Sequence, residues 1–275
     1  MTSYVSLPAL KDRLDIISTD TADDRKIKRA VEAATRTINT MTGQRFQPAT
    51  ATRYLTTQYS DVVWLPYGLI SLTTLATLTS DAGGTRVYGD SWASTDYDLW
   101  PYDATFDDEP YSAIRANAAG AFTYPSNRHG ISVVGSWGWT LDTEAVGTLN
   151  GGIDASVTTL TMTAGHTVEA LNTLLIGSEQ LYVTAVATNS VTVQRARNGT
   201  TAASHLTAAA VLAYQYPDDI TEATAIQALR LFRRSDAPFG IAGAPEVGQT
   251  AVIARVDPDV RLLVRDYRRM AVGAV

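Results

Sequence analysis

The stretch LLIGSEQLYVTAVATNSVTVQRARNGTTAASH, residues 174–205, decides how the middle of the chain folds. Apolar and polar residues alternate in two runs on either side of a polar break, and a Gly/Thr/Ser loop with a histidine follows. Alternation with a period of two is typical of half-buried β-strands. We therefore predict a β-hairpin here, with Asn198-Gly199 making the turn.

This hairpin lies in a longer segment of unusual composition. Residues 146–216 contain thirteen threonines but only five charged side chains. The segments on either side are richer in charge and include stretches with helical spacing. The change in composition predicts that residues 146–216 form a separate all-β domain.

Four side chains of the opening stretch are candidates for chemistry: Glu179, Arg195, Arg197 and His205. Acid/base catalysis would require them to converge in a pocket at hydrogen-bond distance, which the sequence does not establish. The alternative is a hairpin with exposed tips, in which His205 is a surface or turn residue. The domain would then decorate an assembly or contact a neighbouring subunit.

The composition of the 275 residues is ordinary for a soluble protein, with 45% hydrophobic and 18% charged residues. The net charge of −6 argues against sequence-independent binding of nucleic acid over the whole surface, although a local basic patch stays open. The lack of cysteine excludes disulfides and thiolate metal sites. No window resembles a signal peptide or a membrane span, so we expect no membrane partner and synthesis in the cytoplasm.

Helical spacing marks four segments. Ser6 with Pro8 predicts a short N-terminal helix, and Thr21 with Asp24 predicts the start of a longer amphipathic one that Gly43 ends. YPDDITEATAIQALRLFRR, residues 216–234, predicts a third helix. Asp257 predicts the N-cap of a fourth.

Between the second and third helices, residues 50–139 change to a period of two. The strand-like runs are TRYLTT, VVWLP, LTTLATL, YSAIRA and GISVVGSWGW. They are rich in β-branched and aromatic residues, with Gly, Asp and Pro between them. This part of the chain is therefore expected to be antiparallel β-structure.

An acidic stretch interrupts these strands and predicts a long loop or a loosely paired hairpin. Carboxylates at alternate positions suit calcium, but the spacing and glycine of an EF-hand loop are absent, and a solvated loop is the simpler interpretation. Facing a DNA channel, the stretch would repel phosphate and let DNA slide. Its members are Asp90, Asp96, Asp98, Asp103, Asp107, Asp108 and Glu109.

No other catalytic or metal-binding pattern is found. His129 and His166 stand alone in glycine-containing turns, and no His-x-x-x-His spacing occurs. Phosphate-binding glycine loops and nucleophile elbows are also missing. We therefore expect no metal, no cofactor and no enzymatic activity.

The C-terminal part combines an arm and a basic helix. Glycine and proline recur in residues 235–254 at intervals too short for regular structure, which predicts an extended arm. Residues 260–275 then carry four arginines against Asp266, a net charge of +3. The helix would either dock on a partner or pack as an ordinary surface helix on its own subunit.

These pieces in this order resemble a known family. TGQRF, TRYL, WLPYGLISLTTL, VVGSWGW and the 216–234 helix followed by APFG are similar to motifs of the head-tail connector (adaptor) proteins of long-tailed double-stranded DNA bacteriophages and related gene-transfer particles. The resemblance covers residues 1–145 and 217 to about 240. Each motif alone is unspecific, and their order carries the resemblance.

The resemblance implies an α+β fold: a helical bundle with a small antiparallel β part, an inserted all-β domain and an extended C-terminal arm ending in a helix. The expected segments are residues 1–145 (connector core), 146–216 (inserted domain), 217–240 (core helix) and 241–275 (arm and helix). Compact members have only a short connection where residues 146–216 stand.

The resemblance also implies a virion structural protein, assembled in the host cytoplasm, that forms a twelvefold ring beneath the portal. Its partners would be the portal protein, other copies of itself, a neck or tail completion protein, and genomic DNA that passes without sequence-specific binding. The alternative is a tail or baseplate module that binds a cell-surface glycan through residues 146–216. Portal-binding residues would be Val260, Arg261, Leu263, Val264, Arg265, Tyr267, Arg268 and Arg269.

Overall fold

The computed structural model describes residues 3–117, 123–126, 128–234, 241–242, 251–252 and 256–269. The chain forms two compact units, and the four segments expected from the sequence are a different division, which stays a prediction. The first unit comprises Met1–Gly43, Asp142–Arg197 and Thr201–Arg268, and the second comprises Gln44–Leu141, Asn198–Thr200 and Arg269–Val275.

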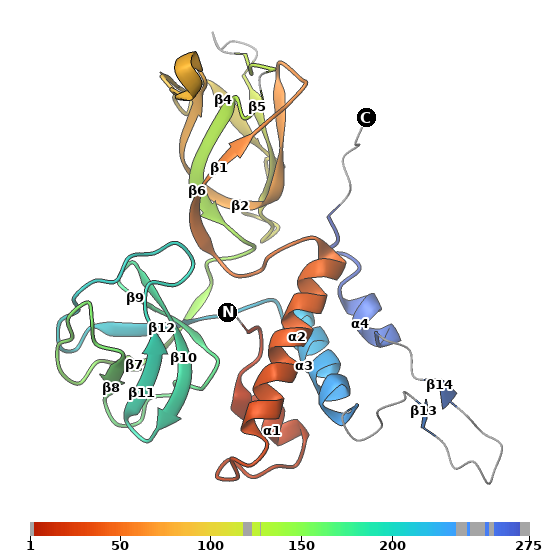
Figure 1. Ribbon diagram of the computed structural model, residues 1–275, viewed down its shortest axis with the longest axis vertical. Helices are drawn as coiled ribbons and strands as arrows, with labels where there is room; N and C mark the ends of the chain where they lie inside the picture. The colour runs from red at the N-terminus through yellow and green to blue at the C-terminus, as the bar shows by residue number, and fades with distance from the viewer. Residues whose placement is uncertain are drawn as a thin grey trace. The chain divides into compact units, whose positions relative to one another are not determined.

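The first unit contains a six-stranded antiparallel sheet that closes into a barrel (Figure 1), with strand order β7-β12-β9-β10-β11-β8. A bridge between Leu149 and Met162, just beyond β7 and β8, joins the two edge strands. Closure removes the exposed edges of an open sheet. The strands are β7 (Thr143–Thr148), β8 (Thr159–Thr161), β9 (Thr173–Ile176), β10 (Glu179–Ala187), β11 (Ser190–Gln194) and β12 (Ala210–Tyr214).

Alternate residues of the strands fill this barrel. Val191 and Val193 of β11 are buried in its core, while Thr192 between them is exposed. The hairpin predicted for the opening stretch is present, but its turn is not at Asn198-Gly199. Ala187 pairs with Ser190, so the turn is the two-residue loop 188–189.

Helices cover one side of the barrel and share a second apolar core with it. Leu10 and Ile27 pack with Leu171 and Tyr182 of the barrel segment. Ser6 caps the first helix, and Gly43 ends the second with a left-handed φ of 68°, both as predicted. The helices are α1 (Leu7–Arg13), α2 (Asp24–Thr42), α3 (Asp218–Arg233) and α4 (Pro258–Leu263).

The start of α2 differs from the prediction. Its N-cap is Asp23, whose side chain makes no capping hydrogen bond. Asp24, expected to belong to a capping motif with Thr21, instead forms an ion pair of 2.6 Å with Lys11 of α1. Lys11 is buried, so its charge draws the nearest carboxylate away from a capping role.

The second unit is built on another six-stranded antiparallel sheet, with order β1-β6-β2-β5-β4 and β3 paired to β2. Two runs expected to be separate strands, VVWLP and LTTLATL, are one strand that pairs first with β5 and then with β6. The elements of the second unit are β1 (Ala49–Leu55), β2 (Val62–Thr77), a 3-10 turn η1 (Ala82–Gly84), β3 (Asp90–Ser91), β4 (Tyr97–Trp100), β5 (Tyr111–Ala116) and β6 (Ile131–Trp137).

A register shift between Trp64 and Leu69 of β2 allows this double pairing. Pro66 lies at the shift, where a missing N–H costs no ladder hydrogen bond. The core of the unit contains Leu69, Ile114 and Trp137.

The predicted helical bundle is therefore wrong. Each six-stranded sheet encloses or covers an apolar core of its own, whereas the helices share theirs with residues of the barrel segment. Helical spacing identified the helices, but their number and length do not make a bundle that could stand without the barrel. The β-structure is the larger part of the described fold.

Little of the C-terminal arm falls within the described residues. Ile241–Ala242 (β13) pairs with Ala251–Val252 (β14) in a short antiparallel ladder, and the APFG motif lies outside the described part. No helix among the described residues is long and apolar enough to cross a bilayer.

Candidate functional site

Glu179, Arg195 and His205 meet in one buried cluster of the first unit. Glu179 begins β10, Arg195 directly follows β11, and His205 forms a β-bridge with Ile153. Their side chains are 0%, 6% and 9% exposed. The structure thus brings together three of the four candidates of the opening stretch. His205, which the alternative interpretation took for a surface or turn residue, has a largely buried side chain.

Both carboxylate oxygens of Glu179 are saturated with hydrogen bonds. Arg195 donates from Nε to Oε1 and from Nη2 to Oε2, each over 2.7 Å. His205 Nε2 donates to Oε2 over 2.9 Å, which fixes its tautomer. The backbone N–H groups of Ala196 and Ala203 complete the set at 3.1 Å each.

These donors hold Glu179 in the charged form. Burial alone would raise its pKa, but the hydrogen bonds from Arg195, His205 and the two backbone N–H groups outweigh burial and lower the pKa to about 2. A carboxylate this acidic and this fully bonded is a poor proton acceptor at neutral pH. The geometry therefore suits a structural centre better than a general base.

Arg195 also ties neighbouring loops to the cluster. Its Nη1 donates to the carbonyls of Asp154 and Val157, and its Nη2 donates to the carbonyl of Ala203. The backbone N–H of Arg197, the fourth candidate, donates to the carbonyl of Gln180. The planar guanidinium, with five donors in a fixed fork, is what allows one side chain to join three segments.

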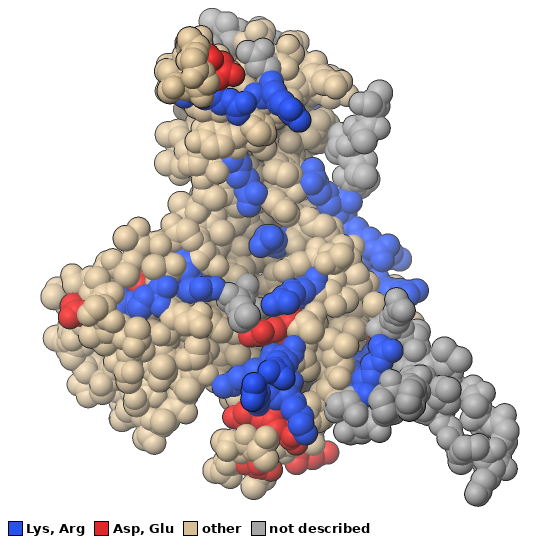
Figure 2. All heavy atoms as spheres, in the orientation of Figure 1, with Lys and Arg blue, Asp and Glu red and all other residues tan. Residues whose placement is uncertain are grey.

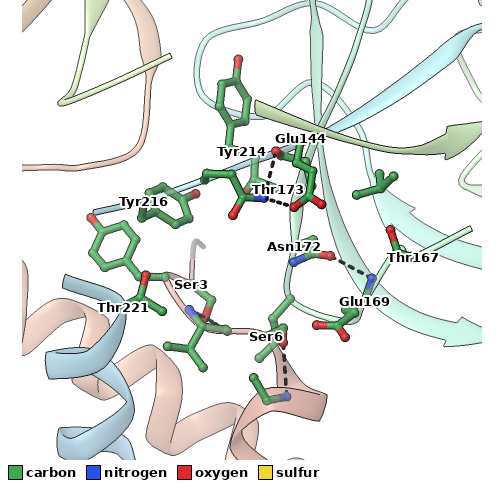
Figure 3. A pocket seen from close by; sticks show the side chains of 17 residues that line it. Ser3, Ser6, Glu144, Thr167, Glu169, Asn172, Thr173, Tyr214, Tyr216 and Thr221 are labelled. Carbon is green, nitrogen blue, oxygen red and sulfur yellow. Dashed lines mark hydrogen bonds between the residues drawn. The ribbon is translucent and has the colours of Figure 1, made fainter. Parts of the chain in front are cut away.

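A cavity of about 360 Å³ opens elsewhere in the first unit (Figure 3). Its walls are the segment that leads into α1, the loop before β9, the end of β12 and the start of α3. The polar and aromatic lining residues are Ser3, Tyr4, Ser6, Glu144, Thr167, Glu169, Asn172, Thr173, Tyr214, Gln215, Tyr216 and Thr221.

The cavity is acidic and partly aromatic. It contains the carboxylates of Glu144 and Glu169 and no lysine, arginine or histidine. Tyr4 packs edge-on against Tyr216, with ring centroids 4.8 Å apart, and burial raises the pKa of the Tyr216 phenol. The lining suits a polar or cationic group. Sequence reasoning missed the cavity because its walls come from residues 3–9, 144–173 and 213–221, which are far apart in the chain.

The C-terminal segment packs on its own chain through one face. Val260 and Val264 are fully buried, and α4 ends at Leu263, whereas the predicted portal-binding residues continue to Arg269. Asp257 caps α4 by accepting from the backbone N–H of Asp259 over 3.0 Å, and it pairs with Arg230 of α3 over 2.6 Å. The segment is therefore held on α3 by both apolar and ionic contacts.

The other face of this segment is exposed. Leu262 is 64% exposed, and Arg261 and Arg265 on either side of it are exposed as well. Leu263 and Tyr267 are half-buried, whereas Arg268 and Arg269 are exposed. Of the eight predicted portal-binding residues, the valines thus point into the protein and the arginines point out.

The acidic stretch is more ordered than a single loop. Asp90 lies in β3 and Asp98 in β4, whereas the last four acids are exposed between β4 and β5. Asp96 accepts from the backbone N–H of Ala93 over 2.7 Å. No group of three or more His, Asp or Glu side chains in the described part of the chain is arranged to hold a metal ion.

The remaining histidines make local contacts. His129 lies 2.8 Å from Arg86 through its Nδ1, and His166 Nε2 lies 2.9 Å from the carbonyl oxygen of Thr188.

One solved structure is similar to this chain. It is described as the neck of an empty GTA particle computed with C6 symmetry. The identity is 14%, the TM-score is 0.45, and the match covers 99% of this chain and 93% of that chain. No family model matches the chain, and no curated protein matches it.

Proposed function

We propose that this chain is a structural neck protein of a phage-like particle, a head-tail connector that sits as a ring beneath the portal. The ordered series of motifs between residues 42 and 234 supports this class. The ring would extend the DNA channel, let the genome pass without reading its sequence, and offer a docking surface to a neck or tail completion protein. No catalytic step belongs to this function.

One observation carries the proposal furthest: the C-terminal segment is locked on one face and open on the other. Val260 and Val264 fix its position on α3, so the exposed Leu262 is presented on a rigid support. A solvated apolar side chain between two arginines has the composition of an interface anchor. The portal is the partner that we propose for it.

Ring formation would follow from a head-to-tail contact between copies, because such contacts close into rings when the rotation allows it. The expected twelvefold number comes from the family resemblance. Contacts of the body and of the C-terminal segment would act together, so that the portal is bound more tightly than by either alone.

Cryo-electron microscopy of the protein mixed with the portal protein of the same particle tests this function. Three variants sharpen the test: truncation after Gly240, Leu262→Asp, and Leu206→Asp as a matched control on an exposed barrel leucine. We expect a ring beneath the portal for the intact protein and the control, and loss of that ring for the other two. A portal that stays bare with the intact protein refutes the connector function.

The cavity supports a second candidate, a tail or baseplate module that binds a cell-surface glycan. Carboxylates, two amides and tyrosines in one concavity are groups that hydrogen-bond and stack on sugars. The walls include residues 3–9, so the site is not confined to residues 146–216 as expected. A glycan array tests it: binding that Glu169→Gln and Tyr216→Ala both abolish would favour this candidate.

A further inference from the structure

Helix α2 has an apolar face and a basic face. Ile27, Val31 and Ile38 are buried against the rest of the first unit. Arg25, Arg29 and Arg36 are exposed. At 100° per residue these arginines lie within about 40° of one another around the helix axis, so they form a single row. We refer to these three residues as the arginine row.

The arginine row has no acidic partner among the described residues. Other basic side chains nearby are engaged: Lys26 pairs with Asp23 over 2.9 Å, and Lys28 donates to the carbonyl of Thr184 over 3.0 Å. Glu32 lies in line with the row, but it is half-buried and forms no ion pair with any arginine that the structure describes. The row thus keeps its charge available to a ligand.

The face that carries the row is not built like a protein interface. None of the exposed large apolar residues in the described part of the chain lies on α2, where the other exposed side chains include Ala33 and Thr40. Protein interfaces have an apolar, often aromatic centre, whereas nucleic-acid interfaces are polar and strongly positive. An acidic protein surface is therefore a poorer match than a polyphosphate.

We propose that the arginine row binds the phosphate backbone of double-stranded DNA without reading its sequence. Arg25 and Arg36 are eleven residues apart, which is about 16 Å along the helix. Figure 2 shows basic side chains following the course of α2 on this face. Guanidinium groups pair with phosphate oxygens bidentately, and the buried face of α2 holds the helix against the rest of the first unit. The inference rests on this surface alone and does not require the ring or the portal.

Salt dependence gives the proposal a quantitative form. Each phosphate contact contributes about 0.9 to the slope of log K against log salt concentration, so three contacts predict a slope of about −2.7. Three contacts bind weakly in one protomer, and the measurement therefore belongs at low salt. No aromatic side chain stands on the row for bases to stack on, so a single strand should not bind more tightly than the duplex.

The experiment is fluorescence anisotropy of a labelled duplex of arbitrary sequence with the full chain, over a series of salt concentrations. The test variant is R25Q/R29Q/R36Q, and the matched control is R261Q/R265Q/R268Q, which removes the same charge from the C-terminal segment. A third variant, R25K/R29K/R36K, keeps the three positive charges. It shows whether substitution at these positions by itself disturbs the fold. Circular dichroism of each variant shows whether the helices are retained.

We expect the test variant to lose duplex binding and the control and lysine variants to keep it. Undiminished duplex binding by the test variant, no duplex binding by the intact protein at low salt, or tighter binding of the single strand each overturns the proposal. The control variant is expected to lose the portal instead, so failure of the portal interaction and failure of DNA binding are seen separately.

Discussion

Arg195 and Glu179 are joined by two hydrogen bonds of 2.7 Å each, in a place where neither side chain has appreciable contact with solvent. The pair links the first residue of β10 to the residue that directly follows β11, the neighbouring strand. Such a pair is costly to break from one side, because the remaining charge stays buried. Its removal is therefore a direct probe of the barrel.

Glu179→Gln is expected to destabilise the first unit by about 3–5 kcal/mol, because Arg195 is left with an uncompensated buried charge. Glu169→Gln is the matched control; Glu169 is half-buried and makes no ion pair with any described residue, and its change should cost within about 0.5 kcal/mol. Urea unfolding followed by far-UV circular dichroism measures both. Equal stability of the two variants would show that the cluster does not hold the barrel together.

Stability should fall in acid because of the same carboxylate. The folded pKa of Glu179, about 2, is below its ordinary value of 4.5, so its contribution is complete above pH 4.5 and is lost as the pH falls toward 2. The size of this contribution is about 3 kcal/mol. Urea unfolding at a series of pH values should show the loss in the native protein, and a shallower dependence in Glu179→Gln. Parallel curves for the two proteins would assign the acid sensitivity to other groups.

Two ion pairs of α1 are expected to differ in strength. Lys11 is buried and binds Asp24 and the carbonyls of Ser18 and Asp20, so Lys11→Met should cost about 2–3 kcal/mol. Arg13 pairs with Glu222 in solvent, so Arg13→Gln should cost less than about 1 kcal/mol. Thermal unfolding measures the two. The reverse order of stabilities would contradict the larger contribution expected for the buried contacts of Lys11.

Gly135→Ala is expected to destabilise the second unit. A Cβ at this position of β6 would lie 2.3 Å from the carbonyl oxygen of Ser71 in β2, so the two strands must separate, at a cost of about 3 kcal/mol. Gly152→Ala is the control in the first unit, followed by far-UV circular dichroism, since the nearest atom to its Cβ would be 3.4 Å away. All five tryptophans belong to the second unit, so their fluorescence reports its unfolding alone. A tryptophan transition unchanged by Gly135→Ala would rule out this close approach of β2 and β6.

Local signals in the sequence identified much of the secondary structure. Ser6 and Gly43 mark a start and an end that the structure confirms, because capping depends on neighbouring residues only. Strand alternation in the opening stretch was recognised for the same reason. The turn at 188–189 was missed. Asn-Gly is the stronger hairpin signal, but the Asn-Gly pair ten residues later lies in a loop outside this hairpin.

Features that depend on distant segments were not predictable. The Glu179 cluster joins residues 26 positions apart, and the cavity joins residues 3–9 to the start of β9 and the end of β12. No periodicity signals such convergence. The end of the C-terminal helix at Leu263 was not predicted either, and the burial of Val260 and Val264 against α3 depends on a segment far away in the chain.

The barrel begins and finishes at one place, because Thr143 of β7 pairs with Tyr214 of β12 and Gln215 donates to the carbonyl of Asp142 over 2.9 Å. A gene could therefore acquire or lose the whole barrel at a single site without stretching the rest of the chain. Such an exchange would uncover the helices, whose apolar side chains rest on Leu171 and Tyr182. In a chain that had lost the barrel, Leu10 and Ile27 would be exposed. We therefore expect these two positions to be substituted in such a chain.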